Sequence, residues 1–130
     1  MPVERKEIES VIRKIADKNL NCIQTIDRIK GQAMMTSLKE FGDGLTYKDI
    51  IAYADMGGLF SAGKKGILLT EEMIRNSSHQ KVLLKDIASL SADPSHDQIT
   101  ISLKDGSSVS FWCKAPYAES TAEILKQIIA

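Results

Sequence analysis

The stretch DQITISLKDGSSVSFWC, residues 97–113, constrains the fold more than any other part of the chain. Apolar and polar residues alternate in two runs, and Asp105-Gly106 lies between them. The apolar positions are Ile99, Ile101 and Leu103, then Val109, Phe111 and Cys113. An Asp-Gly pair between alternating runs is the strongest short-range signal for a β-hairpin. The chain therefore contains antiparallel sheet with one apolar face, which another element has to cover.

Other short apolar runs, bounded by turn residues, surround this hairpin. We expect strands at 47–56, 66–70, 73–76 and 81–90. The last run also fits helical spacing, but the short connections of a meander favour a strand. Pro116 suits the first turn of a helix that runs to the C-terminus. The apolar face of that helix comprises Ala118, Ala122, Leu125, Ile128 and Ile129.

The residues before Gly42 have helical rather than alternating periodicity. From Glu4 to about Ile29 the apolar residues keep helical spacing, with a plausible interruption at 18–21. Gly31 stops this pattern, and 33–41 fits a further short helix. The first part of the apolar stripe comprises Ile8, Val11, Ile12 and Ile15.

The change of period at Gly42-Asp43-Gly44 divides the chain into two parts. Residues 1–42 form an N-terminal helical segment, and 43–130 form the main domain. We predict an α+β fold in which a meander of about six antiparallel strands is covered by the C-terminal helix.

The stretch from about Asp49 to the C-terminus resembles the pleckstrin-homology-like domains of uncharacterised bacterial proteins. The segments that carry the resemblance are AYADMGGLFSAGKKGILLT, KVLLKDIASL and DQITISLKDGSSVSFW. The resemblance implies a partly closed barrel with a capping helix, and a binding or scaffold module that sometimes self-associates. Eukaryotic relatives often bind phosphoinositide head groups between their first two strands. By that likeness the ligand-binding residues here would be Ser61, Lys64 and Lys65, with Arg75 nearby.

The stretch GLFSAGKK, residues 58–65, is one residue away from a phosphate-binding loop. Gly58, Gly63 and Lys64 fill the fixed positions, but Lys65 replaces the Ser or Thr that would hold magnesium. A phosphate-binding loop also needs a following helix, whereas a strand is expected after Lys65. We therefore interpret the segment as a hairpin loop.

No arrangement of catalytic or metal-binding residues emerges from the sequence. His79 and His96 lie in consecutive turns at opposite ends of a strand, so they cannot converge on one metal ion. Glu71 and Glu72 are adjacent and would face opposite sides of a strand. Cys113 falls on the inward register, which suits a buried, inert thiol. We expect no enzymatic activity, no cofactor and no metal.

Composition narrows the classes of partner. Seventeen basic and seventeen acidic residues give no net charge, which argues against nucleic-acid binding. No apolar stretch approaches the ~20 residues that cross a bilayer. The charged N-terminus is not a signal peptide, and two cysteines 91 positions apart fit a reduced intracellular protein. We expect a cytoplasmic location.

Two apolar features need burial or a partner. The stripe with Ile8, Ile12 and Ile15 could pack on the meander or pair with another chain. Trp112 lies on the opposite face to Phe111 and could be covered by the N-terminal helix or form an interaction surface. The leading hypothesis is a non-enzymatic module that binds a protein partner or itself. The alternative is weak binding of anionic lipid head groups through the loop at 58–66.

Overall fold

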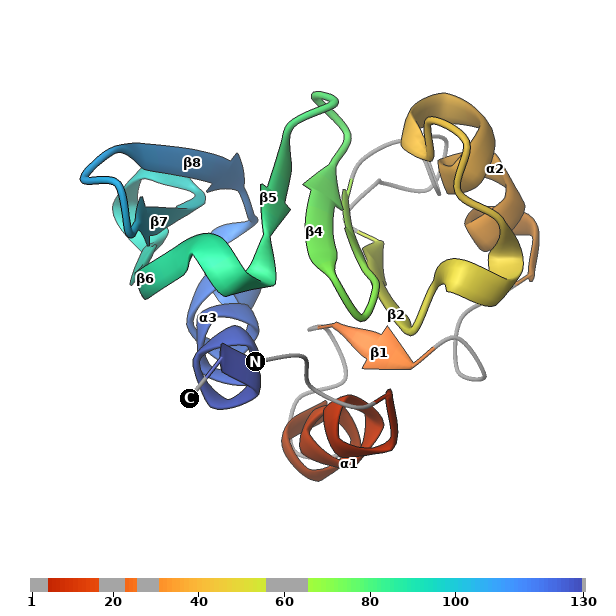
Figure 1. Cartoon of the computed structure of the whole chain (residues 1–130), viewed down its shortest axis with the longest axis horizontal. Helices are drawn as coiled ribbons and strands as arrows, with labels where there is room; N and C mark the ends of the chain where they lie inside the picture. The colour runs from red at the N-terminus through yellow and green to blue at the C-terminus, as the bar shows by residue number, and fades with distance from the viewer. Residues whose placement is uncertain (1–4, 17–22, 26–30, 56–65, 130) are drawn as a thin grey trace.

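The computed structural model of the chain describes residues 5–16, 23–25, 31–55 and 66–129. These residues form an α+β fold of three α-helices and two antiparallel sheets (Figure 1). The helices are α1 (Arg5–Ala16), α2 (Gly31–Phe41) and α3 (Ala115–Ile129), with the short 3-10 helices η2 (Tyr47–Asp49), η3 (Leu84–Asp86) and η4 (Pro94–His96).

The first sheet has five strands in the order in which they occur along the chain. They are β1 (Gln24–Thr25), β2 (Ala52–Asp55), β3 (Gly66–Leu69), β4 (Met73–Asn76) and β5 (Lys81–Leu83). The expected strands at 66–70 and 73–76 are confirmed as β3 and β4. Of the expected strand at 47–56, Ala52–Asp55 forms β2, while η2 occupies Tyr47–Asp49.

The second sheet contains the hairpin that the Asp-Gly signal predicts. Its strands are β6 (Ile87–Asp93), β7 (Gln98–Leu103) and β8 (Ser108–Trp112), in the order β6-β7-β8. Gly106 has a φ of +94°, and Leu103 exchanges backbone hydrogen bonds with Gly106 and Ser107 across the turn, at 3.1 and 2.8 Å. Glycine adopts this left-handed conformation without steric cost, which explains why the turn forms at this position.

The prediction of a single meander is wrong at residues 81–90. The 3-10 helix η3 interrupts that run, so that β5 ends the first sheet and β6 begins the second. Among the described residues the two sheets are not joined into a barrel. The α+β class is confirmed.

The N-terminal segment also differs from its expected form. Gln24 and Thr25, predicted as helix, form strand β1 and pair with β2. Gly31, predicted to end a helical pattern, begins α2 instead. Glycine is tolerated at a helix start as well as after a helix end, so its presence does not say which end it marks.

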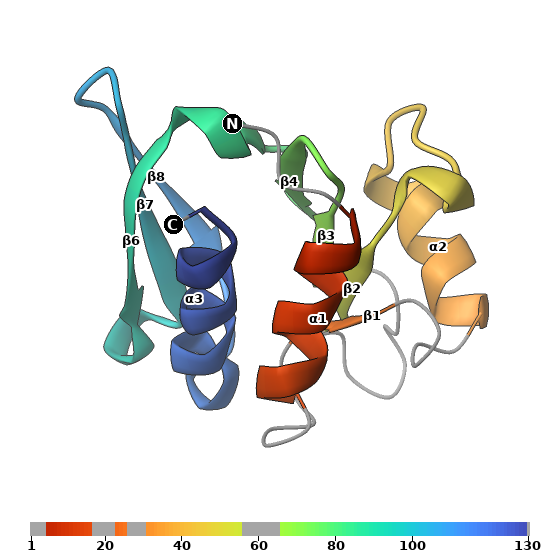
Figure 2. The same cartoon turned by 60° about the horizontal axis from the view of Figure 1, so that its bottom comes forward.

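The C-terminal helix covers the apolar face of the second sheet. Figure 2 shows α3 against that sheet, with α1 beside α3 and α2 on the far side of the first sheet. The predicted face of α3 is confirmed, because Ala118, Ala122, Leu125 and Ile128 are buried and Ile129 is partly buried. No described helix combines the length and the apolar character that would carry it across a bilayer.

The two faces of the first sheet pack into separate apolar clusters. Ala52, Ala54, Ile67 and Leu69 point into the main core, which α1, α3 and the second sheet share. Their neighbours along the chain point the other way, into a smaller cluster under α2 and η2. That cluster comprises Phe41, Ile50, Tyr53 and Leu68. Alternation along β2 and β3 therefore serves two cores, which is why these strands are buried on both faces.

Candidate functional site

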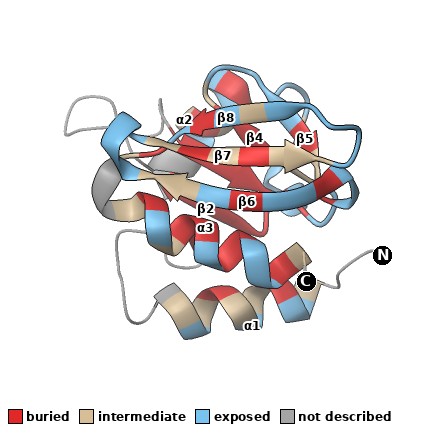
Figure 3. Ribbon diagram, turned by 90° about the vertical axis from the view of Figure 1, so that its left-hand side faces the viewer, coloured by how far each residue is buried: buried red, intermediate tan, exposed pale blue. Residues whose placement is uncertain are grey.

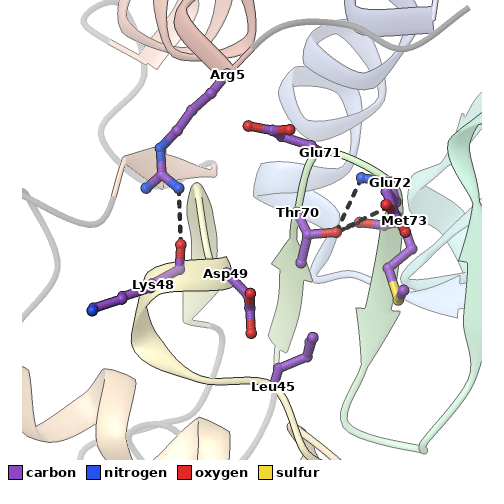
Figure 4. Close-up of a pocket in the computed structure, with 8 residues that line it drawn as sticks. All are labelled: Arg5, Leu45, Lys48, Asp49, Thr70, Glu71, Glu72 and Met73. Carbon is purple, nitrogen blue, oxygen red and sulfur yellow. Dashed lines mark hydrogen bonds between the residues drawn. The ribbon is translucent and has the colours of Figure 1, made fainter.

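A polar pocket of about 310 Å³ lies where the start of α1 meets η2 and the β3–β4 turn (Figure 4). Its polar lining comes from Arg5, Lys48, Asp49, Thr70, Glu71 and Glu72. These residues come from parts of the chain far apart in sequence. The pocket therefore exists only because α1 packs beside η2.

Arg5 links α1 to η2 by hydrogen bonds at the edge of this pocket. Its Nη1 and Nη2 atoms donate to the carbonyl oxygens of Lys48 and Ile50, at 3.1 and 2.9 Å. Its Nε donates to Glu9 Oε1 at 3.1 Å. All three nitrogens thus have an acceptor within the protein. Arg5 accordingly has a structural role that positions the helix.

The remaining polar groups of the pocket mainly shape local turns. Thr70 Oγ1 accepts the N–H groups of Glu72 and Met73, at 3.2 and 3.1 Å. Asp49 Oδ2 accepts the N–H and the hydroxyl of Thr46, at 2.8 and 3.1 Å, which caps η2. Across the ranges 5–16, 23–25, 31–55 and 66–129, no three His, Cys, Asp or Glu side chains are placed to hold a metal ion. Among the lining residues that the structure describes, the hydroxyl of Thr70 contacts backbone groups of Glu72 and Met73.

A second pocket, of about 300 Å³, forms a groove between β6 and the end of α3. It is lined by Ile87, Ala88, Ser89, Leu90, Lys126 and Ile129. Figure 3 shows β6 between β7 and α3, at the edge of its sheet. An edge strand presents backbone N–H and C=O groups that its own sheet does not use. The groove thus combines an apolar floor, the edge of β6 and the ammonium group of Lys126.

The register of β6 is irregular beside this groove. Ile87 pairs with Leu103, but the next pair is Ser89 with Ser102, so Ala88 is an extra residue. Such a bulge bends the strand and increases its twist, and bulges are frequent next to binding sites. Ala88 and Ser89 are both exposed. The bulge therefore places two small, accessible residues at the groove.

A charged cluster forms where β4 and the turn after it meet the turn that follows α2. Arg75 of β4 donates from Nη2 to Asp43 Oδ2, and His79 Nδ1 lies 3.2 Å from the same oxygen. Arg75 is only 8% exposed. The hydrogen bond from His79 is the main cause that lowers the pKa of Asp43, and the charge of Arg75 lowers it further.

This cluster predicts an acid-dependent loss of stability. The pKa of Asp43 is lowered from its ordinary 3.8 in the folded state, so its pairing stabilises the fold above that pH. The contribution is lost as the pH falls through the lowered pKa. We expect the difference in urea midpoint between the wild type and Asp43→Asn to be present at pH 5 and to shrink towards zero as the pH falls below 3.8.

Denaturation in urea at a series of pH values measures this difference. Asp93 and Asp105, whose pKa values are also lowered, are present in both proteins, so the comparison isolates Asp43. A difference that persisted unchanged at pH 2 would contradict the pairing.

Three of the predicted ligand residues, Ser61, Lys64 and Lys65, lie outside the described residues. The strands that flank them are antiparallel neighbours, with Asp55 opposite Gly66. The chain after Lys65 is therefore a strand, as predicted, and the helix of a phosphate-binding loop is absent from this position. Lipid binding through the loop at 58–66 stays a prediction.

The predicted interaction residues divide into two groups. Ile8 and Ile12 are fully buried and Ile15 is partly buried, so α1 packs within its own chain. This correction removes the α1 stripe as an exposed surface. Trp112 is 38% exposed, on the outer face of the second sheet, while α1 packs against α3 and β1 instead. A role for Trp112 in partner binding stays a prediction.

The two histidines have separate partners. His79 contacts Asp43, whereas His96 Nδ1 lies 2.9 Å from Asp93 Oδ2. The sequence argument that they do not converge is consistent with these contacts. Cys113 is fully buried, which confirms its predicted inward register.

Comparison of the chain with protein-family models, with curated proteins and with solved structures finds no match. Inference about function therefore rests on the residues of this chain alone.

Sequence reasoning missed Asp43, Lys126 and the edge position of β6. Asp43 occurs in Gly-Asp-Gly, which the sequence presents only as a break. Lys126 falls on the polar side of an amphipathic helix, where a lysine carries little information. The available signal for the edge of β6 was the pair of small residues Ala88-Ser89 between Ile87 and Leu90.

Proposed function

We propose that this protein is a non-enzymatic binding module that takes an extended segment of a protein partner, or of another copy of itself, alongside β6. The observation that carries the proposal is the groove between the edge strand β6 and α3. A peptide added to a sheet edge gains main-chain hydrogen bonds, while pockets beside the strand select its side chains.

The lining of the groove indicates the type of segment. Ile87, Leu90 and Ile129 suit an apolar side chain, and Lys126 suits an acidic side chain or a terminal carboxylate. A segment with both features would use the whole groove. The small side chains of Ala88 and Ser89 leave room for the added backbone.

The order of the strands supports the resemblance to pleckstrin-homology-like domains. Four consecutive strands, β2 to β5, precede three further strands, β6 to β8, and a closing helix, α3. Strand β1 and helices α1 and α2 are additions from residues 1–42. We accordingly propose a pleckstrin-homology-like architecture with an N-terminal extension that completes its core.

Two substitutions test the groove directly. Peptides selected from a random display library on the wild-type protein should lose at least tenfold in affinity on Ala88→Glu and on Lys126→Glu. The first places a bulky charge in the groove, and the second reverses its charge. The control is Ser110→Glu, which adds the same charge to an exposed position of β8. Fluorescence anisotropy of a labelled peptide measures each affinity.

The selected peptides should share an apolar and an acidic position. Equal affinity for the wild type and both groove variants, or loss of binding only on Ser110→Glu, would refute this site. Light scattering at high micromolar concentration tests the second copy as the occupant. A monomer at every concentration would leave a different protein as the partner.

A further inference from the structure

We propose that Arg75, His79 and Lys81 form a binding site for a phosphomonoester or free phosphate, and that Asp43 of the same chain occupies this site as an internal competitor. The site lies on the β4–β5 hairpin, beneath the turn that follows α2. The proposal is independent of the groove at β6, which lies in the other sheet.

The strand register brings two cations together at this hairpin. Arg75 and Lys81 are directly opposite each other in the β4–β5 pair. Directly opposed residues of an antiparallel pair share a face, with Cβ atoms about 4.5–5.5 Å apart. Like charges at such a position are unfavourable unless an anion lies between or beside them. The side chain of His79, in the turn of the same hairpin, places its Nδ1 atom beside the same carboxylate oxygen that Arg75 contacts.

Asp43 accepts a hydrogen bond from only part of the Arg75 guanidinium group. A guanidinium group has five N–H donors, and the interaction with Asp43 Oδ2 uses Nη2. The Nε of Arg75 is shielded from solvent and has no hydrogen-bond partner. A buried donor without an acceptor is costly and uncommon in native proteins. A phosphate group, with more acceptor oxygens than one carboxylate, could engage several donors of Arg75 at once.

Asp43 lies where it can be displaced. Its side chain is 42% exposed, and it lies in the turn that follows α2, outside any helix or strand. Its φ is +48°, and that of the adjacent Gly44 is +96°. Its contact partner His79 also has a positive φ, of +63°. Two non-glycine residues in the left-handed conformation thus meet at one carboxylate oxygen, and such conformations cluster at binding and switch sites.

The Asp43 carboxylate marks the place that a phosphate dianion would take. The position of the Asp43 carboxylate is open to solvent, so an anion can reach Arg75 Nη2 and His79 Nδ1 from outside. Because the wild-type ligand has to displace Asp43, its apparent affinity is lowered by the competition. Removal of the Asp43 charge therefore raises the apparent affinity of the site for phosphate.

The test compares Asp43→Asn with the wild type in phosphate and in chloride at equal ionic strength. We expect inorganic phosphate to bind Asp43→Asn at least tenfold more tightly than the wild type, as measured by titration calorimetry. The thermal unfolding midpoint of the variant should rise with phosphate concentration, because a ligand that binds only the folded state stabilises it.

The matched control is Asp93→Asn, which removes the carboxylate beside His96 in a similar His–Asp contact without a buried arginine. It should show no gain in phosphate affinity. In the Asp43→Asn background, Arg75→Lys should reverse the gain, since a lysine cannot offer the same fork of donors. Lys64→Ala/Lys65→Ala in that background should leave it unchanged, which separates this site from the loop at 58–66.

Vesicles distinguish the source of the phosphate. If the ligand is carried by a lipid, Asp43→Asn should sediment with phosphatidylcholine vesicles that contain phosphatidic acid, and free phosphate should compete. If the ligand is free, only the calorimetric signal should appear.

The same phosphate response in the wild type, Asp43→Asn and Asp93→Asn would overturn the proposal. If Asp43→Asn is unfolded in chloride, circular dichroism becomes the readout. Recovery of the folded spectrum on addition of phosphate would support the site, and failure to recover it would count against the site.

Discussion

Replacing Gly66 by alanine should lower the free energy of unfolding by about 3 kcal/mol or more. A Cβ atom at this position would lie 2.0 Å from the carbonyl oxygen of Ala54 and 2.7 Å from Cε1 of Tyr53. The nearer of these atoms belongs to the backbone of β2, which cannot move aside without opening the β2–β3 pairing. Urea denaturation followed by circular dichroism measures the loss.

The control for this substitution is Gly106→Ala in the β7–β8 turn. Gly106 has a φ of +94° and no atom within 4 Å of an added Cβ. Its replacement should therefore cost only the conformational strain of a left-handed residue, about 1–2 kcal/mol. If Gly66→Ala were no more destabilising than Gly106→Ala, the close approach of β2 and β3 would be wrong.

The result for Gly66 also concerns the residue that follows the glycine- and lysine-containing stretch at 58–65. Gly66 directly follows Lys65, and its structural role is the close contact between two strands. Gly66 lies outside the phosphate-loop pattern of residues 58–65, and the close contact between strands accounts for the glycine at this position.

The second large effect is expected at Ile12. Its side chain is fully buried in the main core, which α1 shares with α3 and both sheets. Ile12→Ala should therefore destabilise the whole fold by about 2–5 kcal/mol, the range for removing a large apolar side chain from a core. We expect one cooperative transition at a lower urea midpoint, since the N-terminal segment and the sheets share that core.

Ser10→Ala is the matched control, because Ser10 is an exposed residue of the same helix. Its effect should stay within about 0.5 kcal/mol. A midpoint that did not change on Ile12→Ala would mean that α1 contributes nothing to folding of the chain. A loss that diminished as the protein concentration rose would mean that α1 packs against another copy.

Local patterns predicted the elements that depend on neighbouring residues. The β7–β8 hairpin follows from alternation and from one glycine in a left-handed turn. The face of α3 follows from helical spacing after Pro116, and β3 and β4 follow from short runs bounded by turns. In each case the deciding interactions lie within a few residues of one another.

The candidate sites depend on residues far apart in sequence. Asp43 and His79 are 36 positions apart, and Arg5 and Lys48 are 43 apart. The groove at β6 exists because η3 ends one sheet and starts another, so that β6 becomes an edge next to α3. No periodicity encodes such a choice of partner.

By itself, the sequence determined the α+β class, the second hairpin, the closing helix and the inward register of Cys113. Periodicity and turn chemistry are properties of a few consecutive residues, and they set which side of an element is apolar. Only the tertiary structure decided that α1 packs within its own chain, that β1 extends the first sheet and that Asp43 pairs with Arg75. The physical reason is that an apolar face or a buried charge needs a partner wherever it lies. The packing of the whole chain determines which partner it meets.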